Sequence, residues 1–159
     1  MKKAELIKKI LEQLQKELEV ISLSAKAAHA AATHEESKAE DAHDTRGLEA
    51  SYLANAQAGR AHDIQKTIMA FRQMELRDYG PLDLISTGAV VELEQDKTRT
   101  HYFILPFGGG LSLAVEDRTI HVITPQSPLG EELLGRKVGS EFELEARNGV
   151  RCYRIAAIS

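Results

Sequence analysis

The stretch Ile7–Ala32, "IKKILEQLQKELEVISLSAKAAHAAA", decides the fold of the first half of the chain. Its apolar residues recur at alternating steps of four and three, which is the heptad seam of a coiled coil. The seam consists of Ile7, Leu11, Leu14, Leu18, Ile21, Ala25, Ala28 and Ala32. A second seam with the same alternation consists of Ala50, Ala54, Gln57, Ala61, Ile64, Ile68 and Phe71. The two patterns predict two long amphipathic helices.

The two seams match in residue size when the second helix folds back antiparallel on the first. Leu14 then faces Ile68 at the base, and Ala28 faces Ala54 toward the far end. The centre of this register is residue 41, so the chain reverses there. Each arm of about 30 residues would reach roughly 45 Å at 1.5 Å per residue. We therefore predict an antiparallel coiled-coil hairpin with a narrow tip.

The predicted tip is acidic. The stretch His34–Asp44, "HEESKAEDAHD", sets five carboxylates against a single lysine. The carboxylates are Glu35, Glu36, Glu40, Asp41 and Asp44. Capping boxes that begin at Thr33 and Ser37 indicate a break in the helix near this point. An acidic cluster is usually a solvated helix face, but its position at a calculated tip favours a functional role.

The second half changes from helical to strand periodicity after Gly80-Pro81. Short β-rich runs follow, and Asn148-Gly149 marks a hairpin between the last two strands. Between the runs, Ser127 can cap a short helix that begins at Pro128 and ends near Gly135. We therefore predict an α+β protein with two domains, a helical hairpin over 1–78 and a small α+β domain over 79–159.

Composition excludes several classes of protein. The chain has 159 residues and a net charge of −4, which argues against general binding to nucleic acids or membrane surfaces. The single cysteine, Cys152, excludes an intrachain disulfide and a multi-cysteine zinc site. No apolar stretch resembles a signal peptide or a membrane span. These observations predict a cytoplasmic protein without a membrane partner.

The C-terminal stretch Ile123–Leu144, "ITPQSPLGEELLGRKVGSEFEL", resembles the signature of the bacterial Gre transcript-cleavage factors. In that family a Ser-Pro-Leu turn, a short helix and a Gly-[KR]-Lys-Val-Gly segment occur together in an FKBP-like domain. Ser86–Glu94, "STGAVVELE", resembles the opening strand of the same domain. The hairpin followed by a small globular domain also agrees with the family over essentially the whole chain.

The resemblance implies that the chain binds bacterial RNA polymerase and is not itself an enzyme, and the intrachain hairpin predicts a monomer. In this family the globular domain docks at the rim of the secondary channel, which implies a contact at Ser127, Pro128 and Leu129. The hairpin enters the channel and brings acidic residues to the catalytic Mg²⁺. The polymerase then cleaves the nascent RNA of a backtracked complex. Carboxylates suit this task because Mg²⁺ prefers oxygen ligands.

The tip departs from the family, whose sequences read close to Asp-Leu-Ser-Glu-Asn-Ala-Glu-Tyr. Asp41 and Asp44 have the family's spacing of three residues, so we assign the catalytic and metal-binding role to them. Glu36 and Glu40 are a competing pair at a spacing of four. Because the acids differ, two functions remain open: the tip stimulates cleavage of backtracked RNA, or it occupies the channel and inhibits or modulates the polymerase without cleavage.

Three further interpretations compete with these. His34 and His43 flank the acids and would suit a zinc or pH-sensitive site. An FKBP-like domain would suit a prolyl isomerase, although the second half lacks tryptophan and has few aromatic residues. The hairpin would also serve as a dimerisation element, but its alanine-rich end fits an intrachain hairpin better. The glycine run at 108–110 lacks the Gly-Lys-[ST] of a phosphate loop, so we expect a turn.

Overall fold

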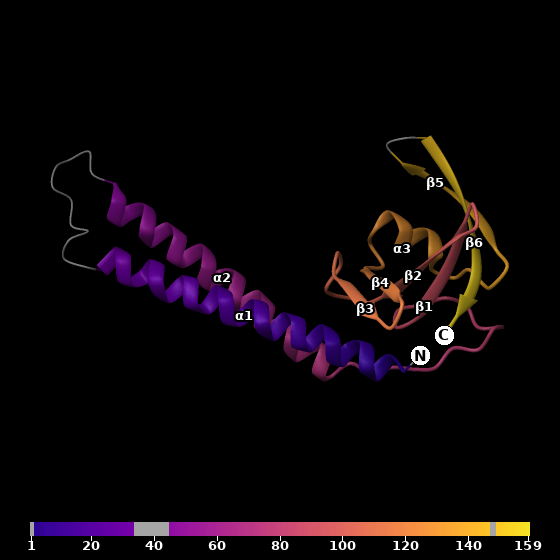
Figure 1. Cartoon of the computed structure of the whole chain (residues 1–159), viewed down its shortest axis with the longest axis horizontal. Helices are drawn as coiled ribbons and strands as arrows, with labels where there is room; N and C mark the ends of the chain where they lie inside the picture. The colour runs from indigo at the N-terminus through magenta and orange to yellow at the C-terminus, as the bar shows by residue number, and fades with distance from the viewer. Residues whose placement is uncertain (1, 34–44, 147–148) are drawn as a thin grey trace. The chain divides into compact units, whose positions relative to one another are not determined.

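The computed structural model describes residues 2–33, 45–146 and 149–159. Two long helices come first, α1 (Lys3–Thr33) and α2 (Arg46–Arg72), followed by six strands and one short helix (Figure 1). The chain divides into two compact units. One is Ile7–Met74, and the other combines Met1–Leu6 with Glu75–Ser159. No helix in the described ranges is both long enough and apolar enough to cross a membrane.

The predicted heptad seam is buried or partly buried along both helices, and Leu6 and Ile10, which lie off the seam near the start of α1, are buried as well. In α1, Ile7, Leu14 and Ile21 are buried, and the seam residues between them are partly buried. In α2, Ile64 and Ile68 are buried in the same way. The helices touch each other, because Arg60 donates a hydrogen bond to Glu17. The helical hairpin is therefore confirmed.

The contacts between the helices agree with the predicted antiparallel register. The predicted register pairs Leu18 of α1 with Ile64 of α2. Leu18 lines one groove together with Gln65, which follows Ile64 in sequence, and Ile68, which lies one helical turn beyond it. The distance from Arg60 Nη2 to Glu17 Oε1 is 2.7 Å. Each of these two residues directly precedes a seam residue, so the ion pair flanks the seam as charged pairs do in coiled coils.

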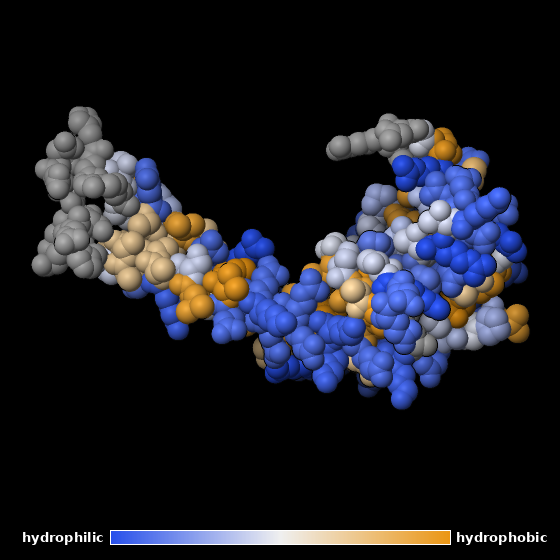
Figure 2. Space-filling view, in the orientation of Figure 1, coloured by the Kyte–Doolittle hydropathy of each residue, from blue (hydrophilic) through white to orange (hydrophobic). Residues whose placement is uncertain are grey.

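Apolar side chains interrupt the polar surface of the hairpin, as the orange areas along the two helices show in Figure 2. They include Val20 and Leu23 on α1, which are 66% and 61% exposed, and Met69 on α2, which is 61% exposed. These residues lie off the seam, so intrachain packing does not explain them.

The second unit is built on a mixed sheet whose strands follow the order β3-β4-β2-β1-β6-β5 in the described residues. The strands are β1 (Val90–Gln95), β2 (Thr98–Ile104), β3 (Ser112–Val115), β4 (Arg118–Ile123), β5 (Glu141–Ala146) and β6 (Gly149–Ile158). All neighbours are antiparallel except β2 and β4, which run parallel with His101 opposite Ile120. The α+β class and the strand-forming runs predicted from the sequence are confirmed.

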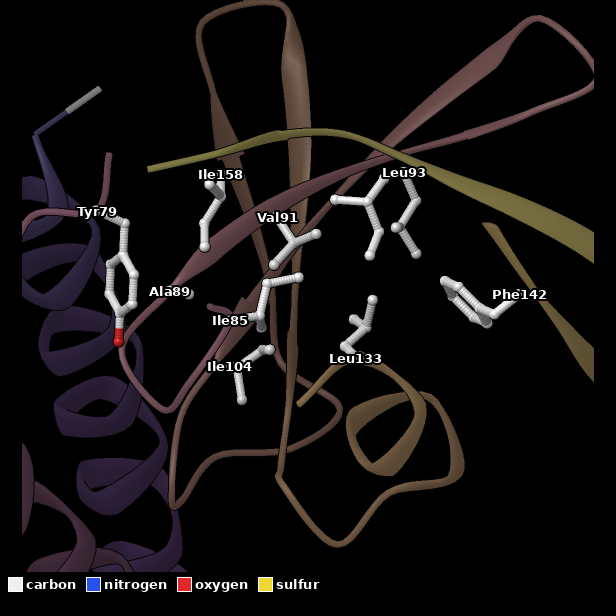
Figure 3. Packing of buried hydrophobic residues seen from close by; sticks show 10 residues of the cluster. Tyr79, Ile85, Ala89, Val91, Leu93, Ile104, Leu133, Phe142 and Ile158 are labelled. Atoms are coloured by element: carbon white, nitrogen blue, oxygen red, sulfur yellow. The ribbon is translucent and has the colours of Figure 1, made fainter. Parts of the chain in front are cut away.

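The core of this unit lies between the sheet and the short helix α3 (Pro128–Leu133). Leu133 of α3 points toward the strand residues Val91 and Leu93, and Phe142 lies beside them (Figure 3). Strand residues alternate between the two faces of a sheet. One face of β1 therefore supplies Val91 and Leu93 to this core, and Glu92 lies on the other.

The loop before the sheet is held by one aromatic side chain. Tyr79 is buried, and its hydroxyl lies 2.6 Å from Ser86 Oγ and donates to the carbonyl oxygen of Thr87 at 2.8 Å. Lys3, in the first turn of α1, donates to the carbonyl oxygen of Arg77 at 2.6 Å. Through these contacts the first turn of α1 becomes part of the compact unit that contains the sheet.

The glycine run forms the predicted turn between β2 and β3. Gly108 and Gly110 have positive φ angles of 76° and 92°, a conformation in which other residues are strained. The backbone N–H of Gly110 donates to the carbonyl oxygen of Val122. The run therefore closes one end of the sheet.

Candidate functional site

The turn that leads into α3 is organised by Ser127. Its hydroxyl donates to the carbonyl oxygen of Thr124 at 2.7 Å and accepts from the backbone N–H of Gly130 at 3.1 Å. The second bond is a helix N-cap, as the sequence predicted, with Pro128 in the first turn. Ser127 therefore uses its hydroxyl within the turn.

Gly130 lets the turn close tightly on itself. A Cβ atom at this position would lie 2.0 Å from the carbonyl oxygen of Thr124 and 2.9 Å from Ser127 Oγ. No side chain fits into that space, and the first of these contacts is with rigid backbone. Glycine is required here for close approach, and the sequence analysis did not identify this position.

The short helix is fixed to the sheet domain at both ends. Leu133 is fully buried and Leu129 packs against the same core. Beyond the helix, Gly135 donates to the carbonyl oxygen of Ile85, and Ile85 donates back to that of Arg136. These bonds hold α3 at one position on the core.

The three predicted polymerase-contact residues differ in their exposure. Pro128 is exposed, Ser127 is partly buried, and Leu129 is partly buried against the core. The exposed neighbours include Gln126, Glu131 and Leu134. The surface available to a partner is therefore centred on Pro128, and Ser127 and Leu129 hold it in place.

The four predicted metal-binding acids lie outside the described residues. Asp41, Asp44, Glu36 and Glu40 all belong to the segment 34–44, as do His34 and His43. The segment connects the end of α1 at Thr33 to the start of α2 at Arg46. In the ranges that the structure describes, no group of three histidine, cysteine or acidic side chains would hold a metal ion.

The capping box at Thr33 predicted a break in the helix near this point, and α1 ends at this residue; the rest of the box, 34–36, lies outside the described residues. Thr33 is the last residue of α1, and its hydroxyl donates back to the carbonyl oxygens of His29 and Ala30. A threonine near a helix end satisfies backbone groups in either direction, so the pattern alone does not tell a start from an end. The residue before α2 is Thr45, whose hydroxyl bonds to Glu49 Oε1 at 3.1 Å.

A polar cluster on the sheet was not predicted from the sequence. Glu92 on β1 accepts a hydrogen bond from Arg99 at 2.8 Å and lies 3.3 Å from His101 Nε2. That nitrogen is buried and lacks a well-aligned hydrogen bond among the described residues. The cluster depends on strand pairing, because Glu92 lies directly opposite His101.

A helical hairpin followed by a mixed-sheet domain, with a capped Ser-Pro-Leu turn on that domain, defines a class of two-part α+β proteins. The family model for the C-terminal part of the transcription elongation factors GreA and GreB matches residues 80–159. This chain belongs to the GreA/GreB family of transcription elongation factors.

Curated relatives match nearly the full length of the chain. The transcription inhibitor protein Gfh1 of Thermus aquaticus is 25% identical over 150 residues, which cover 94% of this chain and 90% of the relative. Gfh1 of Thermus thermophilus is 26% identical over the same coverage. Among solved structures, Thermus aquaticus Gfh1 covers 98% of this chain and 92% of its own length, with 25% identity and a TM-score of 0.40.

Proposed function

We propose that this protein binds bacterial RNA polymerase as a monomer and regulates transcription from the secondary channel, principally as an inhibitor. The observation that carries the proposal is the likeness to Gfh1 over 94% of this chain and 90% of the relative, because the relative is named a transcription inhibitor. The resemblance to the Gre factors implied stimulated RNA cleavage, with a channel-occupying regulator as the alternative. The relatives favour the alternative, in which the hairpin occupies the channel. In either case the polymerase carries the chemistry and this chain is not an enzyme.

Docking of the sheet domain is the first part of the proposal. The exposed ring of Pro128 makes the polymerase contact, and Ser127 positions it through the cap at Gly130. Proline loses little conformational freedom on binding, so it suits a docking surface. Leu129 contributes indirectly, because its side chain packs against the core.

Action at the polymerase metal is the second part. Asp41 and Asp44 would approach the catalytic Mg²⁺, with Glu36 and Glu40 as the competing pair. Two carboxylates hold Mg²⁺ weakly because this ion retains several waters and needs further ligands. The metal would therefore be shared with the polymerase. The surplus of negative charge in the segment 34–44 also favours stimulated cleavage as a second candidate function.

A transcription assay with purified polymerase distinguishes inhibition from cleavage. RNA length is followed in a stalled, backtracked elongation complex and nucleotide addition in an active one. An inhibitor slows addition without shortening the RNA, and a cleavage factor shortens the backtracked RNA. Variants Asp41→Asn and Asp44→Asn test the acids, and Asp63→Asn, on the exposed face of α2, makes the same change outside the segment. No effect of the wild-type protein on either complex would refute both functions.

Binding is measured separately, so that loss of docking is not mistaken for loss of action. We expect Pro128→Ala to weaken binding to the polymerase, whereas Pro81→Ala, at another exposed proline of the same unit, leaves it unchanged. Asp41→Asn and Asp44→Asn should retain binding while they change the transcriptional effect. Equal affinity of the wild type and Pro128→Ala would remove Pro128 from the contact.

A further inference from the structure

A polar cavity lies where the parallel strands β2 and β4 both begin. Its volume is about 240 Å³. It is lined by Arg99, Thr100, His101, Arg118, Thr119 and His121, with Asp117 as the single acid among the lining residues. The cavity is on the sheet domain, and nothing in the proposed docking or metal chemistry uses it.

Strand pairing brings two arginines together at this cavity. His101 of β2 lies opposite Ile120 of β4, and Arg99 and Arg118 each precede this pair by two residues. Successive side chains in a strand alternate between faces, so the two guanidinium groups start from one face on neighbouring strands, and Thr100, Thr119 and His121 start from the other. The cavity lies where the strands begin, and residues of both faces line it. Like charges in this position repel each other. Glu92 and Glu94 offset the charge of Arg99, so Arg118 is the cation with which a bound anion would pair.

The two arginines differ in their partners. Arg99 is paired with Glu92 at 2.8 Å and lies 3.7 Å from Glu94. Arg118 makes no ion pair or hydrogen bond from its side chain to any residue that the structure describes, although Asp117 is its neighbour in sequence. Its guanidinium therefore has five N–H donors available to a ligand.

Uncharged donors complete the lining. Thr100 and Thr119 make no side-chain hydrogen bonds within the described part of the chain, so their hydroxyl groups are available to donate. His121 Nδ1 lies 3.0 Å from Ser112 Oγ, which leaves its Nε2 for a ligand. The Tyr102 ring lies beside His121, with 5.8 Å between the ring centroids. Hydroxyl, imidazole and guanidinium donors together match an acceptor with several oxygens.

We propose that this cavity binds the phosphoryl groups of a small phosphate ligand, with Arg118 as the principal contact and Thr119 as a second donor. A planar guanidinium pairs with two phosphate oxygens at once, which favours phosphate over halide. The cavity is smaller than the roughly 300–1,000 Å³ typical of pockets for drug-sized ligands. It suits a diphosphate group or the phosphate end of a nucleotide, whose base would lie toward Tyr102 and His121.

Calorimetric titration of the full chain tests the proposal, with pyrophosphate, ADP, GDP and uncharged adenosine as probes. We expect saturable binding of the phosphorylated probes and no binding of adenosine. Arg118→Gln should weaken binding about 10-fold or more, and Thr119→Val about 3- to 10-fold, consistent with loss of a charged and a neutral hydrogen bond. The matched control is Arg154→Gln, which removes one exposed positive charge on β6 outside the cavity.

The arms of the experiment separate the sources of the phosphate. Similar affinities for pyrophosphate and ADP identify the phosphate chain as the whole ligand, and tighter binding of ADP or GDP identifies a nucleotide. Circular dichroism and thermal unfolding of each variant establish that it is folded. The proposal is overturned if none of the phosphorylated probes saturates, if adenosine binds as well as ADP, or if Arg154→Gln and Arg118→Gln weaken binding equally.

Discussion

Lys3 Nζ lies 4.3 Å from the ring centroid of Tyr79, and Arg77 Cζ lies 4.2 Å from the same centroid. Two cations therefore contact one buried aromatic ring, an arrangement in which cation–π attraction offsets the loss of hydration. Burial lowers the pKa of Lys3, nearby Asp78 opposes that shift, and Arg77 adds to it. The first turn of α1 is thus held to the sheet domain by a charged side chain that has lost much of its water.

Replacing Tyr79 by phenylalanine should destabilise the sheet domain by about 1–3 kcal/mol. The ring and its cation contacts remain, but the hydroxyl loses its bonds to Ser86 and Thr87, each typically contributing about 0.5–1.5 kcal/mol. Urea unfolding measures the change. Tyr52→Phe on the exposed face of α2 is the control and should leave stability unchanged. Wild-type stability of Tyr79→Phe would show that the hydroxyl bonds contribute nothing.

The substitutions Gly130→Ala and Gly59→Ala should act in opposite directions. At residue 130 a methyl group would collide with the backbone of Thr124, so we expect a loss of about 3 kcal/mol or more. At residue 59, within α2, nothing lies within 4 Å of the new methyl group. Alanine should stabilise that helix by about 0.5–1 kcal/mol, because it restricts the backbone more than glycine does.

Thermal unfolding of both glycine variants measures these two expected changes in stability. Each is the control of the other, since the chemical change is identical and only the surroundings differ. A destabilised Gly59→Ala would contradict the open surroundings at residue 59, and a Gly130→Ala that unfolds like the wild type would contradict the close approach described for the turn at Ser127.

Ser127 should behave as a positioning residue. Ser127→Ala removes the helix N-cap, which should cost about 0.5–2 kcal/mol and weaken polymerase binding. Ser127→Asp keeps an oxygen that can accept from the N–H of Gly130, so it should restore much of the stability and the binding. Stability is measured by urea unfolding and affinity by titration against the polymerase. If Ser127→Asp restores stability but not binding, then the hydroxyl itself touches the partner.

Tyr102 should be the source of a late phase in an alkaline titration. Burial raises its pKa above the ordinary 10.0, Tyr153 adds to the shift, and Arg151 opposes it. Above pH 10.0 the unfolded chain releases this proton before the folded protein does, so stability falls as pH rises through the folded pKa. We expect Tyr102→Phe to remove the late phase from the ultraviolet absorbance of tyrosinate and to flatten that fall in stability.

The outcome of the Tyr102 experiment is unambiguous because phenylalanine keeps the ring beside His121. Tyr52→Phe, at a position 67% exposed, is the control and should leave the late phase intact. Persistence of the late phase in Tyr102→Phe would assign it to another residue.

Periodicity predicted those parts of the fold that local physics determines. The seams of α1 and α2 could be recognised in the sequence because residues such as Leu14 and Ile64 recur at the heptad spacing. The cap at Ser127 could be recognised because it is a bond between near neighbours in sequence. Pairing between distant strands has no such signal. The cluster of Glu92 with His101 and the cavity at Arg118 exist because particular strands lie side by side.

The same distinction applies within the candidate site. Ser127, Pro128 and Leu129 were selected together by resemblance, yet their exposure differs because the turn folds the hydroxyl and the leucine inward. The requirement for glycine at residue 130 could not be predicted from the sequence, since one glycine in a short helix has no distinctive spacing. Its requirement follows from a contact with Thr124 that becomes visible only in three dimensions.

The bond from Lys3 to Arg77 joins residues 74 positions apart, with the whole hairpin between them. During synthesis, the helical seams are complete before the strands of the sheet domain have emerged. The hairpin can therefore form early, while the first turn of α1 waits for partners that are translated much later. Because a preformed hairpin brings residues 7 and 74 toward each other, it shortens the effective loop that must close and lowers the entropic cost of that closure. The long insertion thus becomes an aid to folding of the domain it interrupts.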